Sequence, residues 1–267
     1  MKSVANIGLA EVNAVYDGHE GDLWELIMGQ QIHIGGFKSS LDLAESAGIG
    51  AGLNGVDLCC CNGAGMRFLV RFRNVAAMTG VDATTTVVER GRERCVQEGL
   101  ADRIRFVQAD VCNSGLPGAS ADFVWGEDAW CYVTDKAKLV AEAARVVKAG
   151  GTIAFTDWVE GPKGLTDAEA ERFMRFMKFP TLQDIPGYAR ALADNGCTVQ
   201  AADDTGRFAP YMDLYLSMID MQLTYDALRI IGFNAEVMGA LAGEMMFIRE
   251  LAHAGKVAQG RFIARRK

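Results

Sequence analysis

Proline is scarce in this chain, with only five residues among 267, while hydrophobic residues make up 50% of it. That composition excludes collagen-like and low-complexity disordered proteins. No stretch approaches the roughly 18 consecutive apolar residues that a membrane-spanning helix needs. The N-terminal residues mix acids with apolar side chains and lack the apolar core of a signal peptide. We therefore expect a globular, cytoplasmic protein that does not bind a membrane.

The seven cysteines show neither a disulfide framework nor the spacing of a zinc site. Their number is odd, and three of them are consecutive, Cys59 to Cys61, which does not match a C-x-x-C ligand pair. We interpret them as reduced thiols and expect no metal ion. The 27 basic and 34 acidic residues give a net charge of −7, which disfavours a nucleic-acid partner.

Segments typical of strands and helices alternate from about residue 55 onward. The expected strands are residues 56–60, 76–83, 103–110, 121–128, 152–158, 197–203 and 260–266. One expected helix runs from about Asp135 to Lys148, where glycines follow, and residues 212–254 form a later helical stretch. Strands separated by helices predict an α/β fold with a doubly wound, mostly parallel seven-stranded sheet.

No linker, repeat or charge block divides the chain, so we expect a single domain over residues 1–267. Within it, residues 1–40 are expected to form lid helices and residues 50–160 the cofactor-binding core. Residues 160–240 are expected to include segments that cover the carboxyl edge of the sheet, where ligands of such sheets bind.

Acidic residues lie at or near the ends of the first four expected strands: Asp57, Asp82, Asp110 and the pair Glu127-Asp128. Carboxylates at four strand ends along one sheet edge would repel a pyrophosphate and attract a cationic sulfonium. This favours S-adenosylmethionine over a nicotinamide dinucleotide. Asp82 is placed to bind the ribose and Asp110 the adenine amine. Any one acid alone is equally well explained as the N-cap of the next helix.

Four segments resemble class I S-adenosylmethionine-dependent methyltransferases: VDLCCCNGAG (56–65), TGVDATTTVVERGRE (79–93), RFVQADV (105–111) and residues 126–157. The flanking residues 23–37 and 176–208 are similar to the sarcosine/dimethylglycine N-methyltransferase group. The resemblance implies a Rossmann-like fold and S-adenosylmethionine as cofactor. The residues it implies as cofactor-binding are Asp57, Cys59, Gly63, Asp82, Ala83, Asp110, Val111 and Glu127.

The first turn departs from the pattern of that family. Where the family usually has three glycines, this chain has Cys59, Cys61 and Gly63. A Cβ atom at two points of close approach crowds a left-handed turn or the bound cofactor. The departure raises the alternative that the chain keeps the fold as a non-catalytic binding protein.

Three residues are candidates for work on the methyl acceptor: His33, Asp128 and Tyr132. His33 either takes a proton from the acceptor or anchors the lid by hydrogen bonds. Asp128 and Tyr132 follow the fourth strand, where the resembling family faces its substrate, and a carboxylate beside aromatic rings suits an ammonium group.

The expected reaction is in-line methyl transfer to a small-molecule acceptor. The resemblance favours the nitrogen of an amine or amino acid, with an oxygen, carbon or sulfur of a small metabolite as the alternative. A nicotinamide-dependent dehydrogenase ranks third, because the chain has no G-x-G-x-x-G motif. The sequence leaves open whether the protein forms a homodimer.

Overall fold

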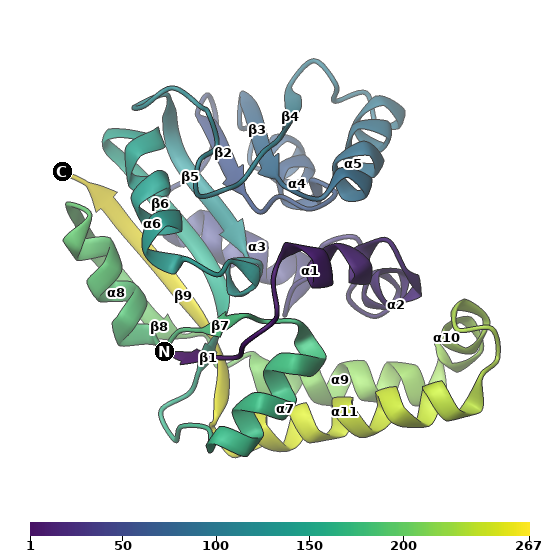
Figure 1. Ribbon diagram of the computed structural model, residues 1–267. Coiled ribbons are helices and arrows are strands. Elements are labelled where there is room, and N and C mark those ends of the chain that lie inside the picture. The colour runs from purple at the N-terminus through teal and green to yellow at the C-terminus, as the bar shows by residue number, and fades with distance from the viewer.

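The computed structural model describes residues 1–267, whose centre is a seven-stranded sheet in the order β4-β3-β2-β5-β6-β9-β8 (Figure 1). Only β9 runs antiparallel to its neighbours β6 and β8. The strands are β2 (Asn54–Leu58), β3 (Ala77–Asp82), β4 (Ile104–Gln108), β5 (Ala121–Glu127), β6 (Val147–Glu160), β8 (Cys197–Asp204) and β9 (Val257–Arg266). The predicted doubly wound α/β fold with seven strands is confirmed.

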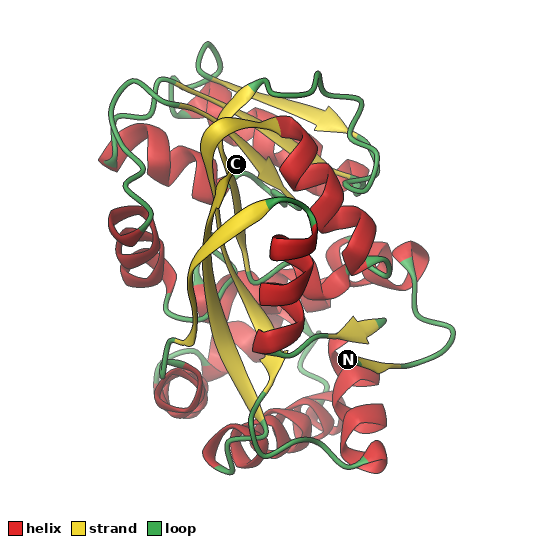
Figure 2. Ribbon diagram, turned by 90° about the vertical axis from the view of Figure 1, so that its left-hand side faces the viewer, coloured by secondary structure: helices red, strands yellow, loops and turns green.

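Helices cover both faces of the sheet (Figure 2). One face is covered by α3 (Gly36–Ser46), α4 (Ala64–Phe72) and α5 (Thr85–Gln97), and their buried side chains form one core. The other face is covered by α6 (Lys136–Val146) and α8 (Ile185–Asp194), which build a second core. Along α6, Leu139, Val140 and Ala143 are fully buried at helical spacing, and the Asp135 side chain caps its first turn.

A third core lies beyond the carboxyl ends of the strands (Figure 1). The helices around it are α1 (Leu9–Tyr16), α2 (His19–Met28), α7 (Asp167–Met177), α9 (Phe208–Met221), α10 (Thr224–Ile230) and α11 (Ala235–His253). A two-stranded sheet, β1 (Lys2–Ser3) with β7 (Thr181–Leu182), ties the N-terminus to this region. Of these helices, α1, α2 and α7 contribute side chains to the space in front of the sheet edge.

Two predicted helices differ in the structure. The helix expected to reach Lys148 ends at Val146, because β6 already begins at Val147 and Gly150, with a φ of +73°, lies inside that bulged strand. The stretch 212–254 is broken into α9, α10 and α11, and α10 and α11 meet at a bend of 117°. No single helix has the length and apolar character of a membrane span; α10 and α11 pass that test only when they are taken together.

Candidate functional site

Two adjoining pockets lie at the carboxyl edge of the sheet. The outer pocket, of about 1110 Å³ including its open mouth, lies between α1 and the ends of β3 and β4. The inner pocket, of about 660 Å³, lies between the end of β2, the end of β5 and the segment that joins α2 to α3. The two pockets share Tyr16, Cys59, Cys61, Ala129 and Tyr132. They form one continuous site with two ends.

The residues expected to bind a cofactor divide between these pockets, with one exception. Asp82, Ala83, Asp110 and Val111 line the outer pocket, Asp57 and Glu127 line the inner one, and Cys59 lines both. Gly63 lines neither. It precedes α4 with a φ of +74°, and a Cβ atom there would lie 2.5 Å from Cζ of Phe106. Packing against β4 and the left-handed turn therefore explain this glycine.

Asp82 organises the loop that follows β2. Its Oδ2 accepts a hydrogen bond of 2.9 Å from the backbone N–H of Cys61, and its Oδ1 accepts one of 2.9 Å from that of Thr84. Each carboxylate oxygen can accept a further bond. Burial raises the pKa of Asp82, although the backbone N–H groups act in the opposite direction. Asp110 is exposed by comparison, and its Oδ1 accepts only the N–H of Cys112 at 2.8 Å.

Two carboxylates surround Gly65 in the inner pocket. A Cβ atom at Gly65 would lie 2.6 Å from Oε2 of Glu127 and 3.6 Å from Oδ2 of Asp57. Burial, and then the charges of Glu127 and Asp82, raise the pKa of Asp57 well above its usual value, and no hydrogen bond offsets this rise. Nearby, the buried indole N–H of Trp125 has no acceptor. Such a site lacks a cation, and a ligand ammonium or sulfonium would supply one.

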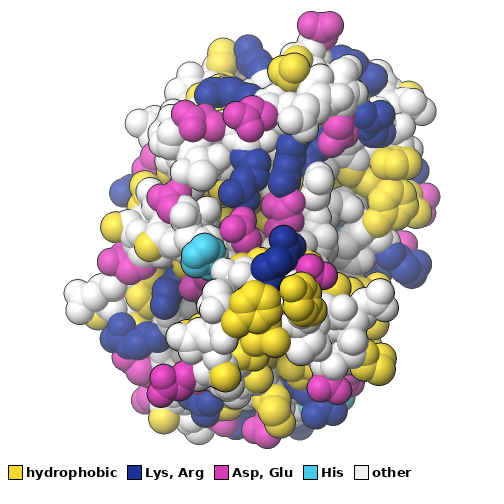
Figure 3. All heavy atoms as spheres, turned by 90° about the vertical axis from the view of Figure 1, so that its right-hand side faces the viewer, with side chains coloured by type: hydrophobic (Ala, Val, Ile, Leu, Met, Phe, Trp, Pro, Cys, Tyr) yellow, Lys and Arg dark blue, Asp and Glu magenta, His cyan; other side chains and the backbone are white.

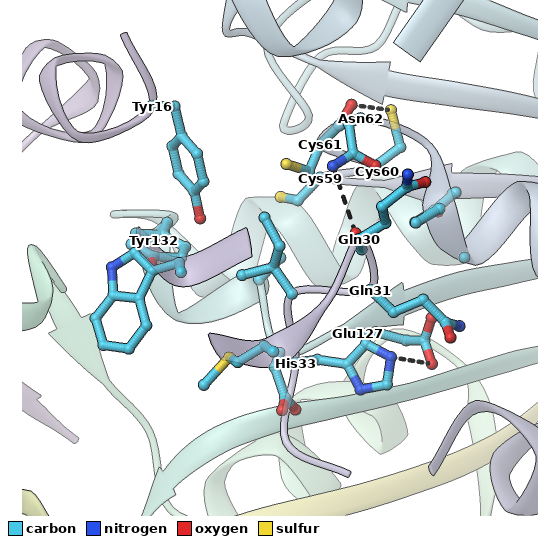
Figure 4. Close-up of a pocket in the computed structure, with 18 of the residues that line it drawn as sticks. Tyr16, Gln30, Gln31, His33, Cys59, Cys60, Cys61, Asn62, Glu127 and Tyr132 are labelled. Carbon is cyan, nitrogen blue, oxygen red and sulfur yellow. Dashed lines mark hydrogen bonds and ion pairs between the residues drawn. The ribbon is translucent and has the colours of Figure 1, made fainter. Parts of the chain in front are cut away.

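His33 lines the inner pocket and is tied to Glu127 there (Figure 4). Only 3% of His33 is exposed. Its Nε2 lies 3.1 Å from Oγ of Ser40 and 3.3 Å from Oε1 of Glu127, while its Nδ1 lies 3.3 Å from the carbonyl oxygen of Ile34. The Ser40 hydroxyl donates to the same Glu127 oxygen at 2.6 Å. Both ring nitrogens are therefore engaged by the protein.

Asp128 holds the segment between α2 and α3 against the sheet. Its Oδ2 accepts the backbone N–H of Ile34 and the side-chain amide of Gln259, both at 2.8 Å. Its Oδ1 is buried without a partner. The residue has a left-handed φ of +51°, which the turn after β5 imposes. Asp128 thus joins three segments that are far apart in the sequence.

Tyr132 and Tyr16 face one another across the junction of the two pockets (Figure 4). Their ring centroids are 6.1 Å apart, in an edge-to-face arrangement. Burial raises the pKa of both phenols above the ordinary value. Both hydroxyls therefore stay protonated and neutral, able to donate and to accept hydrogen bonds.

The sequence did not reveal the clamp that holds the lid to the loop after β2. Arg67 of α4 is buried, and its guanidinium donates to the carbonyl oxygen of Asn62 at 2.6 Å and to Oε1 of Gln30 at 2.7 Å. Gln30, Gln31 and Asn62 line the inner pocket. An arginine among the apolar residues of a helix gives no sign of such a role, because its partners lie elsewhere in the chain.

The cysteines occupy the backbone positions that glycine favours. Cys59 and Cys61 have φ angles of +65° and +47°, in the left-handed region. Both side chains line the pockets, and burial raises the pKa of Cys61 to about 12 and that of Cys59 well above its usual value. Both groups are thiols rather than thiolates near neutral pH, so neither is an activated nucleophile.

Replacing Cys59 and Cys61 together with glycine should stabilise the protein. A left-handed backbone costs a non-glycine residue about 1–2 kcal/mol, which glycine avoids. Glycine is more flexible in the unfolded chain, however, and this offsets about 0.5–1 kcal/mol of the gain. We expect the free energy of unfolding, measured with urea, to rise by about 1 kcal/mol. Cys60→Gly is the matched control and should destabilise, because Cys60 is buried and has no left-handed φ. A double variant less stable than the wild type would show that the left-handed backbone at Cys59 and Cys61 is not strained.

Known proteins that are similar to this chain are methyltransferases. A family model described as a methyltransferase domain matches residues 56–155, from β2 into β6. Over 213 residues the chain is 27% identical to 27-O-demethylrifamycin SV methyltransferase of Amycolatopsis mediterranei, covering 74% of this chain and 77% of that protein. It is 30% identical over 159 residues to dimethylglycine N-methyltransferase of Parasynechococcus marenigrum, covering 53% of this chain and 56% of that protein.

The fold is also that of a solved methyltransferase. Phosphoethanolamine N-methyltransferase 2 of Haemonchus contortus, in complex with phosphomonomethylethanolamine and S-adenosylhomocysteine, superposes with a TM-score of 0.83 and 19% identity. The match covers 94% of this chain and 59% of that one. The matched domain and the sheet order lead to one conclusion: residues 56–155 form a methyltransferase domain with the Rossmann-like fold of these enzymes.

Proposed function

We propose that this enzyme transfers the methyl group of S-adenosylmethionine to the amine nitrogen of a small acceptor that carries no anionic group near that nitrogen. One observation supports this most strongly. The inner pocket has carboxylates and aromatic walls, but none of the 20 residues that line it is a lysine or an arginine.

The cofactor would occupy the junction of the two pockets. Asp82, at the end of β3, would accept hydrogen bonds from the ribose, while Asp110 and Val111 would bind the adenine. Asp57 and Glu127, around Gly65, would face the amino group of the methionine part. Cys59 and Ala83 would line the walls, and Gly63 would act only through the shape of the turn. Bound S-adenosylmethionine supplies a methyl group on a positively charged sulfur, which these carboxylates would stabilise.

The acceptor would lie among the aromatic rings of the inner pocket. Tyr16, Trp24, Tyr132 and Trp158 line it. Aromatic rings attract a methylammonium product through cation–π contacts of about 0.5–2 kcal/mol. A carboxylate or phosphate on the acceptor would find no lysine or arginine to pair with among the residues that line this pocket. A simple amine therefore suits this pocket better than an amino acid does.

The three residues expected to work on the acceptor take different roles in this proposal. Tyr132 lines the pocket with a neutral hydroxyl, so it would orient the amine by a hydrogen bond. His33 would act as a positioning residue for Glu127, since its ring nitrogens contact Ile34, Ser40 and Glu127. Asp128 would position the lid through Ile34 and Gln259. Transfer then depends chiefly on orientation of the amine lone pair.

A pair of acceptors of equal length tests the absence of a cation in the pocket. We expect 3-amino-1-propanol to be methylated with a kcat/KM roughly tenfold or more above that of β-alanine, because the buried carboxylate of β-alanine would lack a partner. The measurement is the rate of S-adenosylhomocysteine formation. Propylamine is the control for the hydroxyl group. Equal rates for the alcohol and the acid, or a preference for the acid, would contradict the proposal.

A further inference from the structure

A second, apolar space adjoins the site on the side of α2. This apolar compartment encloses about 530 Å³, part of it open to solvent, between α2, α7, α9, α10 and α11. Its lining residues are Glu20, Leu23, Trp24, Ile27, Phe176, Leu216, Ile219, Ala227, Met238, Leu241, Ala242 and Met245. Glu20 is the one residue among them that is not hydrophobic.

The partition between this compartment and the inner pocket is one layer of side chains. Trp24 lines both spaces. On either side of it, successive residues face opposite ways: Ile27 lines the compartment and Met28 the pocket, while Phe176 lines the compartment and Met177 the pocket. The Trp24 and Phe176 rings meet edge to face, with centroids 6.5 Å apart. Movement of one indole ring would connect the two spaces, and the methionines beside it adapt readily to a new neighbour.

The compartment has the character of a binding site rather than of a closed core. Leu216, Ile219 and Leu241 are only half-buried, and Ala242 is exposed. Figure 3, which views the side where α2 and α10 lie, shows hydrophobic side chains grouped on this surface. Apart from Glu20, no polar residue lines this compartment. A hydrocarbon group that filled it would remove apolar surface of both partners from water.

We propose that the methyl acceptor is an amine with an extended apolar group, and that this group occupies the apolar compartment beyond Trp24. This inference rests on the proposed function, because it assumes that the amine lies in the inner pocket. The acceptor class is then an amphiphilic amine, with its nitrogen among the carboxylates and rings of the inner pocket and its hydrocarbon part between α2, α9 and α11.

Chain length is the first test. With primary n-alkylamines from butylamine to decylamine, kcat/KM should rise about three- to fourfold for each added methylene, the value expected for burying one. Ala242→Trp would fill the compartment from its rim, so it should flatten this dependence and lower the kcat/KM of decylamine at least about tenfold while leaving that of butylamine unchanged. Ala240→Trp is the matched control, since Ala240 is also exposed on α11 but does not line the compartment. A slope near zero in the wild type would overturn the proposal.

Binding of n-alkanols separates this inference from the proposed function. Decanol should bind the enzyme saturated with S-adenosylhomocysteine more tightly than hexanol, quench tryptophan fluorescence, and lose its affinity in Ala242→Trp. If alkanols bind in this way but no amine is methylated, the proposed function fails while the compartment remains a hydrocarbon site. If short amines are methylated but decanol does not bind, the compartment proposal fails alone. Absent decanol binding together with a change of oligomeric state in Ala242→Trp would assign the compartment to a subunit contact and overturn the proposal.

Discussion

Replacing Asp82 with alanine is expected to weaken S-adenosylmethionine binding by about 100-fold, the largest effect of any single change at the site. The carboxylate would lose its proposed bonds to the ribose, and each charge-assisted bond is worth about 1.5–3 kcal/mol. The N–H groups of Cys61 and Thr84 would also lose the acceptor that now shapes the loop after β2. Isothermal titration of S-adenosylmethionine measures the effect.

Asp110→Ala is the control for this change. Asp110 is exposed and its side chain accepts only one backbone N–H. Asp110→Ala should therefore weaken the binding of S-adenosylmethionine by about tenfold or less. Thermal unfolding of both variants establishes that each is folded at the temperature of the titration. If Asp82→Ala binds the cofactor as the wild type does, another residue holds the ribose and the assignment of the outer pocket is wrong.

Replacing Gly65 with alanine is expected to lower the affinity for S-adenosylmethionine by about 10- to 100-fold. The added Cβ would lie 2.6 Å from Oε2 of Glu127 and 3.2 Å from Nε1 of Trp125. Glu127 cannot move away freely, because Ser40 and His33 hold its other oxygen. Loss of one close contact with the methionine part, together with displacement of Glu127, corresponds to about 1.4–3 kcal/mol. The dissociation constant and kcat/KM should both change.

A glycine in open space is the matched control for Gly65. A Cβ at Gly243, in α11, would meet nothing within 4 Å. Alanine is favoured over glycine inside a helix by up to about 1 kcal/mol. Gly243→Ala should therefore leave cofactor binding unchanged and raise the stability slightly. Wild-type affinity in Gly65→Ala would show that the methionine part does not bind between Asp57 and Glu127.

The sequence predicts most of the sheet because its signals are local. Buried strands are recognisable as short apolar runs in the sequence. The carboxyl ends of parallel strands lie at one edge of the sheet irrespective of the conformation of the loops. For this reason Asp57, Asp82, Asp110 and Glu127 could be placed at one edge from the sequence alone, where the pockets lie. Alternation of strands and helices fixes the class of fold in the same way.

The rest of the site depends on contacts that the sequence does not encode locally. The partners of Asp128 lie 94 and 131 positions away, at Ile34 and Gln259. The anchoring contacts of His33 and the clamp of Arg67 are likewise set by how the lid folds back onto the sheet. At Gly63 the motif position predicts a ligand contact, and the structure adds a packing reason for the glycine, because the Phe106 ring leaves no room for a Cβ atom. Helix ends also depend on context, as at Val147, where pairing with β5 replaces the last helical turn.

The proposed acceptor of the methyl group is an amine nitrogen held in the inner pocket. A single acceptor that offers both a nitrogen and an oxygen tests it most directly: the enzyme is incubated with S-adenosylmethionine and 3-amino-1-propanol, and the product is identified by mass spectrometry and NMR. We expect N-methylation, with one S-adenosylhomocysteine formed for each methyl group transferred. Formation of the O-methyl ether, or release of S-adenosylhomocysteine without any methylated nitrogen, would contradict it.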